Sequence, residues 1–202
     1  MKKILIPALL TLFSALATGA QESDFGLWGS LQVEKKWDNG WYANTRLEYR
    51  QRDGGLDLWF LRPTVGYKVA PWLSADLGFD RFENASSVQY RALLSATFTL
   101  KQGPLTASLR QRYIRSYNTT ASTWGNLFRA QLKTSYAVSG TPFTPFIAIE
   151  IYAWEHWKQT HHMAGTRLRL SPHHSFELFY VYATSATRPE AHILAAGYTL
   201  TL

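Results

Sequence analysis

The side chains best suited to chemistry in this sequence are arginines placed two residues apart. Arg46 and Arg50 flank Glu48, and Arg110 and Arg112 enclose a single residue. On a β-strand, a spacing of two puts side chains on the same face. Guanidinium groups bind carboxylate and phosphate oxygens, and one arginine can donate two parallel hydrogen bonds. The spacing therefore predicts a charged surface that either pairs internally or attracts anions.

This charged surface is predicted to be mainly basic. If each segment with this spacing is a strand, eleven basic and five acidic side chains share one face. They are Arg46, Arg50, Arg62, Lys68, Arg91, Arg110, Arg112, Arg129, Lys133, Arg167 and Arg169, with Glu48, Asp76, Asp80, Glu150 and Glu177. Enclosed charges must pair, form hydrogen bonds or stay hydrated. Two interpretations remain open: a network of ion pairs that fills the interior, and a narrow anion-preferring passage or binding site.

Alternation of apolar and polar residues identifies the elements that carry these charges. In 90–100, Tyr90, Leu94 and Phe98 lie on one face and Arg91 on the other. The same period of two, typical of half-buried strands, recurs in 25–36, 41–50, 56–69, 73–82, 105–116, 128–136, 143–154, 162–170, 175–182 and 194–202. The sequence therefore predicts an all-β fold.

The connections between these segments are of two kinds. Short turns with glycine or proline occur at 38–40, 70–71, 101–104, 139–142 and 171–172. Longer polar links occur at 51–55, 83–88, 117–122, 155–161 and 183–191. Alternating short and long connections indicate consecutive antiparallel hairpins with two different ends.

The amino terminus has the layout of a secretory signal. Residues 1–3 include two lysines, residues 4–17 are mostly apolar, and residues 18–20 have small side chains. The apolar run is too short to span a bilayer easily as a helix. We expect cleavage near Ala20, so that 1–20 is a signal peptide that is absent from the folded protein.

Three features favour a membrane barrel over a soluble sandwich or lipocalin-like barrel. The predicted signal delivers the chain to the envelope, and aromatic residues crowd both ends of the strands, as in interfacial belts. The last strand also keeps apolar residues up to Leu202. Only helices and closed barrels satisfy the backbone in hydrocarbon. We therefore expect a closed antiparallel barrel in the bacterial outer membrane, in contact with its lipid, with short periplasmic turns and modest external loops.

The pattern resembles an uncharacterised family of small bacterial outer-membrane β-barrel proteins, a domain of unknown function. The motifs that carry the resemblance are Phe25-Gly26-Leu27-Trp28, Leu47-Glu48-Tyr49-Arg50, Arg110-Gln111-Arg112, the segment 146–150 and Gly197-Tyr198-Thr199-Leu200. The resemblance implies a location and a fold for nearly the whole exported chain. It implies no catalytic residues.

The strand number leaves one segment to be assigned. Bacterial single-chain barrels prefer even numbers of strands. We therefore expect about ten strands in a barrel of residues 41–202, with twelve as the alternative. The segment 21–40 would then hold an extra strand, or an element in the lumen or the periplasm.

Aromatic and histidine residues around the link 155–161 form a second candidate surface. Trp154, Trp157, His161 and His162 are a possible contact for another outer-membrane protein or a surface lipoprotein, and the alternative for the tryptophans is an interfacial belt. Adjacent histidines on a strand point to opposite faces, so we expect exposed histidines and no metal site.

The composition argues against several other functions. The chain has no cysteine, which excludes a disulfide scaffold and a thiol enzyme. A lipid hydrolase is the rival enzyme class, but no G-x-S-x-G motif is present. The formal net charge is +7, yet the basic residues are spread through many strands rather than gathered in a patch, so we expect no nucleic-acid partner. We expect a structural or small-solute role, without a catalytic activity or a cofactor.

Overall fold

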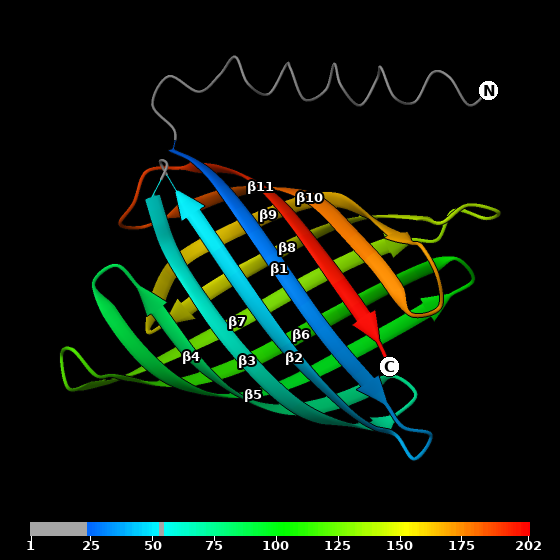
Figure 1. Ribbon diagram of the computed structural model, residues 1–202, viewed down its shortest axis with the longest axis horizontal. Coiled ribbons are helices and arrows are strands. Elements are labelled where there is room, and N and C mark those ends of the chain that lie inside the picture. Colours follow the sequence, from blue (N-terminus) through cyan, green and yellow to red (C-terminus); the bar gives the residue numbers. More distant parts are fainter. Residues whose placement is uncertain (1–23, 53–54) are drawn as a thin grey trace.

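The computed structural model describes residues 24–52 and 55–202, and these residues form a closed barrel of eleven strands (Figure 1). The predicted signal peptide lies outside the described residues. Within the described residues, no helix is long and apolar enough to cross a membrane. The strands are β1 (Asp24–Lys36), β2 (Trp41–Arg52), β3 (Gly55–Ala70), β4 (Leu73–Asn84), β5 (Ser87–Gln102), β6 (Leu105–Asn118), β7 (Thr123–Tyr136), β8 (Phe143–Trp154), β9 (His156–Arg169), β10 (His174–Ser185) and β11 (Ala191–Thr201).

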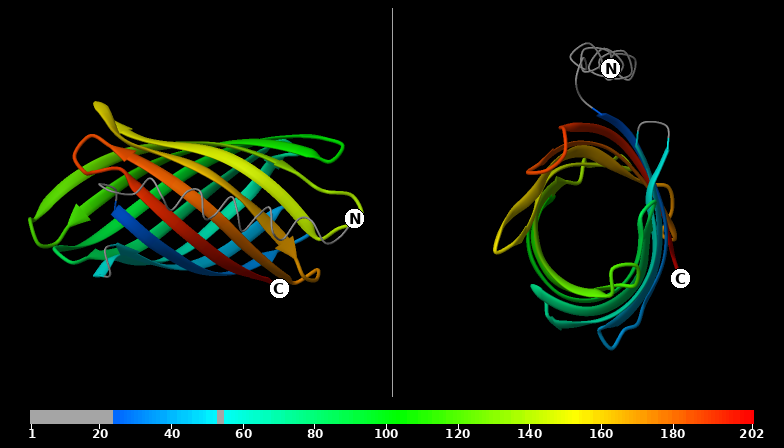
Figure 2. Two further views of the ribbon diagram at one scale, coloured as in Figure 1. Left: turned by 90° about the horizontal axis from the view of Figure 1, so that it is seen from above. Right: turned by 90° about the vertical axis from the view of Figure 1, so that its left-hand side faces the viewer.

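The barrel closes through a pair of parallel strands. Each strand pairs antiparallel with the next along the chain, and β1 pairs in parallel with β11, from Asp24 opposite Ala191 to Glu34 opposite Thr201. The end-on view in Figure 2 shows the resulting oval ring. A closed ring of hairpins with an odd number of strands must contain one parallel pair. Closure gives every strand two neighbours, so no sheet edge remains unpaired.

The predicted barrel is confirmed, and the strand number is eleven rather than ten. The segment Asp24–Lys36 is neither a lumen element nor a periplasmic one, because its backbone pairs with β2 on one side and β11 on the other. It is therefore an additional wall strand, one of the possibilities that the sequence left for this segment.

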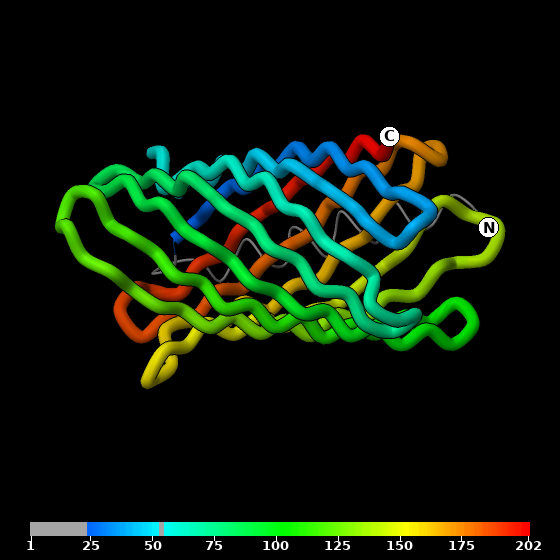
Figure 3. Tube along the Cα trace, turned by 90° about the horizontal axis from the view of Figure 1, so that it is seen from below, coloured from blue at the N-terminus to red at the C-terminus, as the bar shows by residue number. Residues whose placement is uncertain are grey.

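The parallel closure places the two ends of the described chain at opposite rims, as Figures 1 and 3 show. At the rim where β1 begins, Asp24 N donates to Glu190 O at 3.1 Å. At the other rim, Leu202 N donates to Glu34 O at 2.8 Å. We call these the amino-terminal rim and the carboxy-terminal rim. The short turns predicted from sequence all lie at the carboxy-terminal rim, including the Asn-Gly turn, where Gly40 has a φ of 90°.

The connections are of similar length at the two rims. Strands extend into the links that the sequence predicted to be long, so that only Glu155 separates β8 from β9. Conversely, the turn 137–142 at the carboxy-terminal rim is longer than 119–122 at the amino-terminal rim. Connection length therefore does not distinguish the two ends, contrary to the expectation from sequence.

The wall has an apolar exterior and a charged interior. Outward side chains such as Leu77, Leu100 and Ile147 are 60–71% exposed, whereas Asp80 and Glu150, which point inward, are at most 2% exposed. This arrangement is the reverse of a soluble barrel and is typical of a membrane barrel. The soluble alternative is therefore wrong for this chain.

Aromatic side chains gather on the outer wall near both rims, as the sequence predicted. Those at the carboxy-terminal rim include Trp37, Trp41, Tyr67, Trp72, Tyr136 and Phe143, and those at the amino-terminal rim include Tyr90, Trp124, Trp154 and Trp157. Aromatic residues at these two levels match the interfacial belts of a bilayer-spanning barrel.

Candidate functional site

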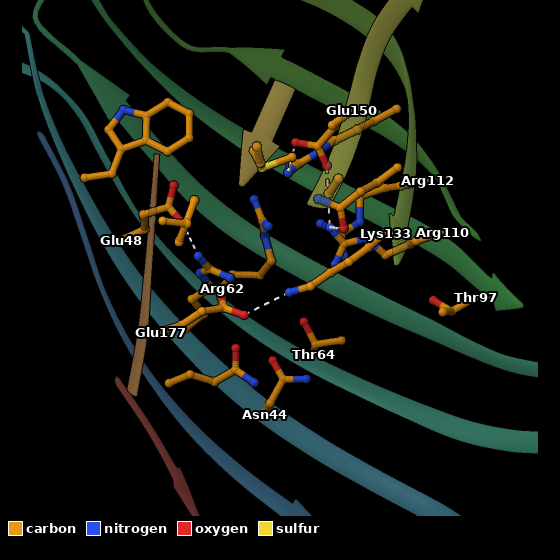
Figure 4. Close-up of a pocket in the computed structure, with 18 of the residues that line it drawn as sticks. Asn44, Glu48, Arg62, Thr64, Thr97, Arg110, Arg112, Lys133, Glu150 and Glu177 are labelled. Carbon is orange, nitrogen blue, oxygen red and sulfur yellow. Dashed lines mark hydrogen bonds and ion pairs between the residues drawn. The ribbon is translucent and has the colours of Figure 1, made fainter. Parts of the chain in front are cut away.

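The interior of the barrel contains a cavity of about 350 Å³ in which positive charge predominates (Figure 4). Eight basic and four acidic side chains line it. They are Arg46, Arg50, Arg62, Arg110, Arg112, Arg129, Lys133 and Arg167, with Glu48, Asp76, Glu150 and Glu177. The alternation of each strand brings these side chains inward. The cavity therefore has the basic balance that the sequence predicted for the lumen.

Asp80 is the centre of the most enclosed group of charges. Its carboxylate is fully buried and accepts hydrogen bonds from Arg62 at 2.6 and 2.8 Å and from Arg91 at 2.6 and 2.9 Å. Arg62 also lies over the ring of Phe60, at 4.2 Å from the centroid. The pairing of one carboxylate with two guanidinium groups leaves this group with a net positive charge.

Glu150 organises a second group on the opposite part of the wall. Arg129 reaches its two carboxylate oxygens at 2.6 and 2.7 Å, and the Tyr152 hydroxyl donates to it at 2.8 Å. Arg110 is 3.6 Å away, and His161 Nδ1 is 3.8 Å away. This buried carboxylate therefore joins residues from β6, β7, β8 and β9.

Glu48 and Glu177 complete the close ion pairs of the cavity. Arg46 and Arg50 each approach Glu48 to 2.6 Å on the same strand. Lys133 on β7 reaches Glu177 on β10 at 2.8 Å, although two strands separate them, as the dashed line in Figure 4 shows. Ion pairs therefore hold the wall together locally and also across strands that are not neighbours.

Arg110 and Arg112 are the cavity arginines with the weakest compensation. Arg112 is 7% exposed, donates from Nε to Ser95 at 2.8 Å, and keeps its Nη2 4.0 Å from Asp76. Arg110 donates to the neutral Gln131 at 3.1 Å. Neither guanidinium group has a carboxylate oxygen closer than 3.6 Å among the described residues. Their unused donors can therefore bind an anion that enters the cavity.

A second cavity of about 310 Å³ lies at the amino-terminal rim. The two cavities have only Trp28 and Arg50 in common among their lining residues. The ring of His161, from β9, lies 5.4 Å from the Trp28 ring, although β10 and β11 separate β9 from β1. Trp28 and Arg50 therefore lie where the two cavities meet, and His161 lines the second cavity beside them.

Apolar side chains also point into the lumen, in addition to the charges predicted from the sequence. Phe60, Leu93, Ile114, Val181 and Ile193 are at most 5% exposed although they lie on inward positions. Their signal was present in the sequence, since Leu93 shares a face with an arginine and a serine. Val181 and Ile193 belong to a buried apolar cluster against which Trp28 packs.

The structure corrects the location of one residue of the second candidate surface. His161 is not in an external loop but in β9, where it points into the lumen and is 3% exposed. His162 follows it and faces outward, with its ring 6.1 Å from that of Tyr182. Trp154 and Trp157 lie exposed on the outer wall near the amino-terminal rim. The four residues do not form one surface, and a protein partner at the tryptophans stays a prediction.

Two of the basic residues predicted for the lumen lie apart from the network. Lys68 and Arg169 are near the carboxy-terminal rim, exposed, and without an ion pair in the described part of the chain. The other predicted charges all take part in the groups around Glu48, Asp76, Asp80, Glu150 or Glu177. Across the described ranges, no three His, Asp or Glu residues are placed to hold a metal ion.

Residues 25–192 match a family model described as "Protein of unknown function (DUF2490)". The chain belongs to this family. Among curated proteins, no relative matches it significantly. The predicted family resemblance is therefore confirmed, and it covers both β1 and the strands that line the main cavity.

Solved structures show which known fold the DUF2490 chain shares. The NanC porin superposes with a TM-score of 0.53 and 16% identity over 79% of this chain and 85% of the porin chain. The KdgM porin superposes with a TM-score of 0.52 and 13% identity, over 75% of this chain and 81% of the porin chain. A structure of the KdgM porin in complex with disordered oligogalacturonate superposes with a TM-score of 0.55 and 12% identity, over 83% of this chain and 93% of the porin chain. The DUF2490 chain thus shares the β-barrel fold of these porins.

Proposed function

We propose that this protein spans the bacterial outer membrane and forms a passage or binding chamber for small anionic solutes. The observation that carries the proposal is the main cavity, where basic side chains outnumber acidic ones by eight to four. An enclosed chamber with one sign of charge concentrates ions of the opposite sign. No covalent chemistry is part of this proposal.

Arg110 and Arg112 are the residues proposed to contact the solute. They lie on the same face of β6, and their guanidinium groups are not saturated by close carboxylates. Both groups line the main cavity. A carboxylate, phosphate or sulfate could accept paired hydrogen bonds from either one. The KdgM porin, whose fold is similar, has been solved with oligogalacturonate, a carboxylated sugar chain.

The predicted export signal and the carboxy-terminal strand support a proposal for the orientation in the membrane. Outer-membrane barrels are folded from the periplasm, and we propose that the carboxy-terminal rim faces that side. The amino-terminal rim and its cavity would then face the outside of the cell. A solute would meet the smaller cavity first, pass the boundary at Trp28 and Arg50, and then enter the main cavity.

The test is ion selectivity in planar bilayers under a salt gradient. We expect channel events with a reversal potential that indicates anion preference. Replacing Arg110 and Arg112 together by glutamine should move the reversal potential toward zero, because these side chains carry uncompensated charge in the cavity. Arg115→Gln is the control, since it removes one positive charge from the outward face of the same strand.

Three results would count against the proposal. The wild-type protein could show no channel events and no binding of carboxylate or phosphate solutes, it could prefer cations, or the Arg115→Gln control could lower anion preference as much as the double variant. Heat-dependent migration of each variant on a gel shows beforehand that the barrel has folded. A folded but silent protein would favour the other interpretation, a lumen closed by ion pairs.

A further inference from the structure

Two arginines near the amino-terminal rim point away from the lumen, toward the lipid. Arg81 on β4 lies over Trp59, with its Cζ 5.4 Å from the ring centroid. Arg115 on β6 lies over Trp124 in the same way, at 4.9 Å. A guanidinium group stacked on tryptophan is held at the depth of the interfacial belt, where the indole ring is stable.

The two arginines differ in their charge compensation. Arg81 forms an ion pair with Glu83 at 2.8 Å. Arg115 donates instead to the neutral Asn126 Oδ1 at 2.8 Å, and no carboxylate lies within 4.0 Å of it among the described residues. Arg115 therefore presents a full positive charge on the outer wall, whereas the charge of Arg81 is neutralised within the protein.

The surroundings of Arg115 offer further polar groups at the same depth. Asn126 Oδ1 also accepts a hydrogen bond from the Tyr113 hydroxyl at 2.6 Å, which leaves the Asn126 amide nitrogen available as a donor. The Tyr113 ring lies 6.1 Å from the ring of Trp154. Arg115 is near the end of β6, Trp124 is near the start of β7 and Trp154 ends β8, so all of these groups lie close to the rim.

We propose that Arg115 and Asn126, framed by Tyr113, Trp124 and Trp154, bind the phosphate of an anionic membrane lipid. A charge on the lipid-facing wall is costly unless it lies near the interface and finds a counterion. The headgroup phosphate supplies that counterion and can accept two hydrogen bonds from one guanidinium group. The neighbouring aromatic rings contact the glycerol and upper acyl region. This site lies on the outer wall and does not depend on the proposed passage.

The experiment measures how much lipid stays bound when the purified protein leaves a detergent micelle. Micelles hold equal amounts of phosphatidylglycerol and phosphatidylcholine, and native mass spectrometry counts the retained lipids. We expect wild type to retain phosphatidylglycerol preferentially. Arg115→Gln should weaken this retention about fivefold, which corresponds to about 1 kcal/mol for one basic residue at an anionic surface.

Two variants of the Arg81–Glu83 ion pair are the matched controls. Arg81→Gln should leave lipid retention unchanged, because Glu83 already neutralises that charge. Glu83→Gln should increase retention of phosphatidylglycerol, because it frees Arg81 to act as Arg115 does. All three variants change exposed side chains and keep the barrel interior intact.

The outcomes distinguish a lipid site from general adsorption and from a site for free anions. Equal retention by wild type and Arg115→Gln would overturn the proposal, and so would equal losses in Arg115→Gln and Arg81→Gln, which would indicate general adsorption to the wall. If Glu83→Gln retained no more phosphatidylglycerol than wild type, the charge argument would be contradicted. Displacement of the lipid by inorganic phosphate alone, as effectively as by phosphatidylglycerol, would assign the site to a free anion instead.

Discussion

The guanidinium carbon of Arg50 lies 3.8 Å from the centroid of the Trp28 ring, where the two cavities of the lumen meet. The two residues are direct partners across β1 and β2. Glu48 forms an ion pair with Arg50 at 2.6 Å, and the ring of His161 lies 5.4 Å from the Trp28 ring. The boundary therefore depends on a strand, β1, whose place in the barrel was uncertain from sequence.

Replacing Trp28 by alanine is expected to join the two cavities. Loss of the indole ring should raise single-channel conductance in planar bilayers, at a cost in stability of about 2 kcal/mol from the lost cation–π contact. Trp72→Ala, which removes an exposed tryptophan from the outer wall, is the control and should leave conductance unchanged. A conductance for Trp28→Ala equal to that of wild type would show that this side chain does not limit the passage.

Replacing Asp80 by asparagine is expected to be strongly destabilising. The change removes the only carboxylate that both Arg62 and Arg91 contact at ion-pair distance within the described chain, so two enclosed guanidinium groups lose their partner. The expected cost is about 3–5 kcal/mol in the free energy of unfolding, measured by urea unfolding in detergent or lipid vesicles.

The control for Asp80 is an ion pair at the rim. Asp57→Asn removes the partner of Arg188, which lies 3.4 Å away and is well exposed. An exposed pair contributes at most about 1 kcal/mol. If the two asparagine variants lost the same amount of stability, the interior network would not be the feature that holds these strands together.

Replacing Gly165 by alanine is expected to disturb the wall where two aromatic rings pack inside it. A methyl group there would lie 2.3 Å from Phe179 Cβ and 2.4 Å from Leu178 O, which is backbone. The rings of Phe146 and Phe179 flank this position, 5.9 Å apart. We expect overpacking to lower the free energy of unfolding by about 1–3 kcal/mol, which would be measured as a lower midpoint of urea unfolding. Gly29→Ala, with no atom within 4 Å of the added methyl group, should fold with unchanged stability.

A disulfide across the closing seam tests the parallel pairing of β1 and β11. The chain has no cysteine, so the double variant Gly29→Cys/Ala196→Cys contains only the two thiols introduced. These positions are direct partners and should form a disulfide on mild oxidation. The pair Gly29→Cys/Leu200→Cys should not, because Leu200 lies opposite Val33, four residues further along β1. Cross-linking of the second pair alone would mean that the barrel closes in another register.

The direction in which most side chains face could be predicted from the sequence. In segment 90–100, the alternation assigned Leu94 to the outside and Arg91 to the inside, and both assignments are confirmed. The same reasoning failed for His161, because the segment 155–161 is polar and lacks a regular alternation. In the structure β9 already begins at His156, so most of this segment is strand. Its pairing with β8 has a register shift next to Tyr152.

The alternation along each strand was enough to predict charges inside a barrel and lipid-compatible residues outside, because a period of two is a local property of each strand. The same local pattern does not indicate which charges on different strands form ion pairs. Lys133 and Glu177 are 44 residues apart and belong to strands that do not pair. Their contact, like that of Trp28 with His161, depends on the register of every intervening strand and on the closure of β1 against β11. Closure is a property of the whole ring, so no single segment carries a signal for it.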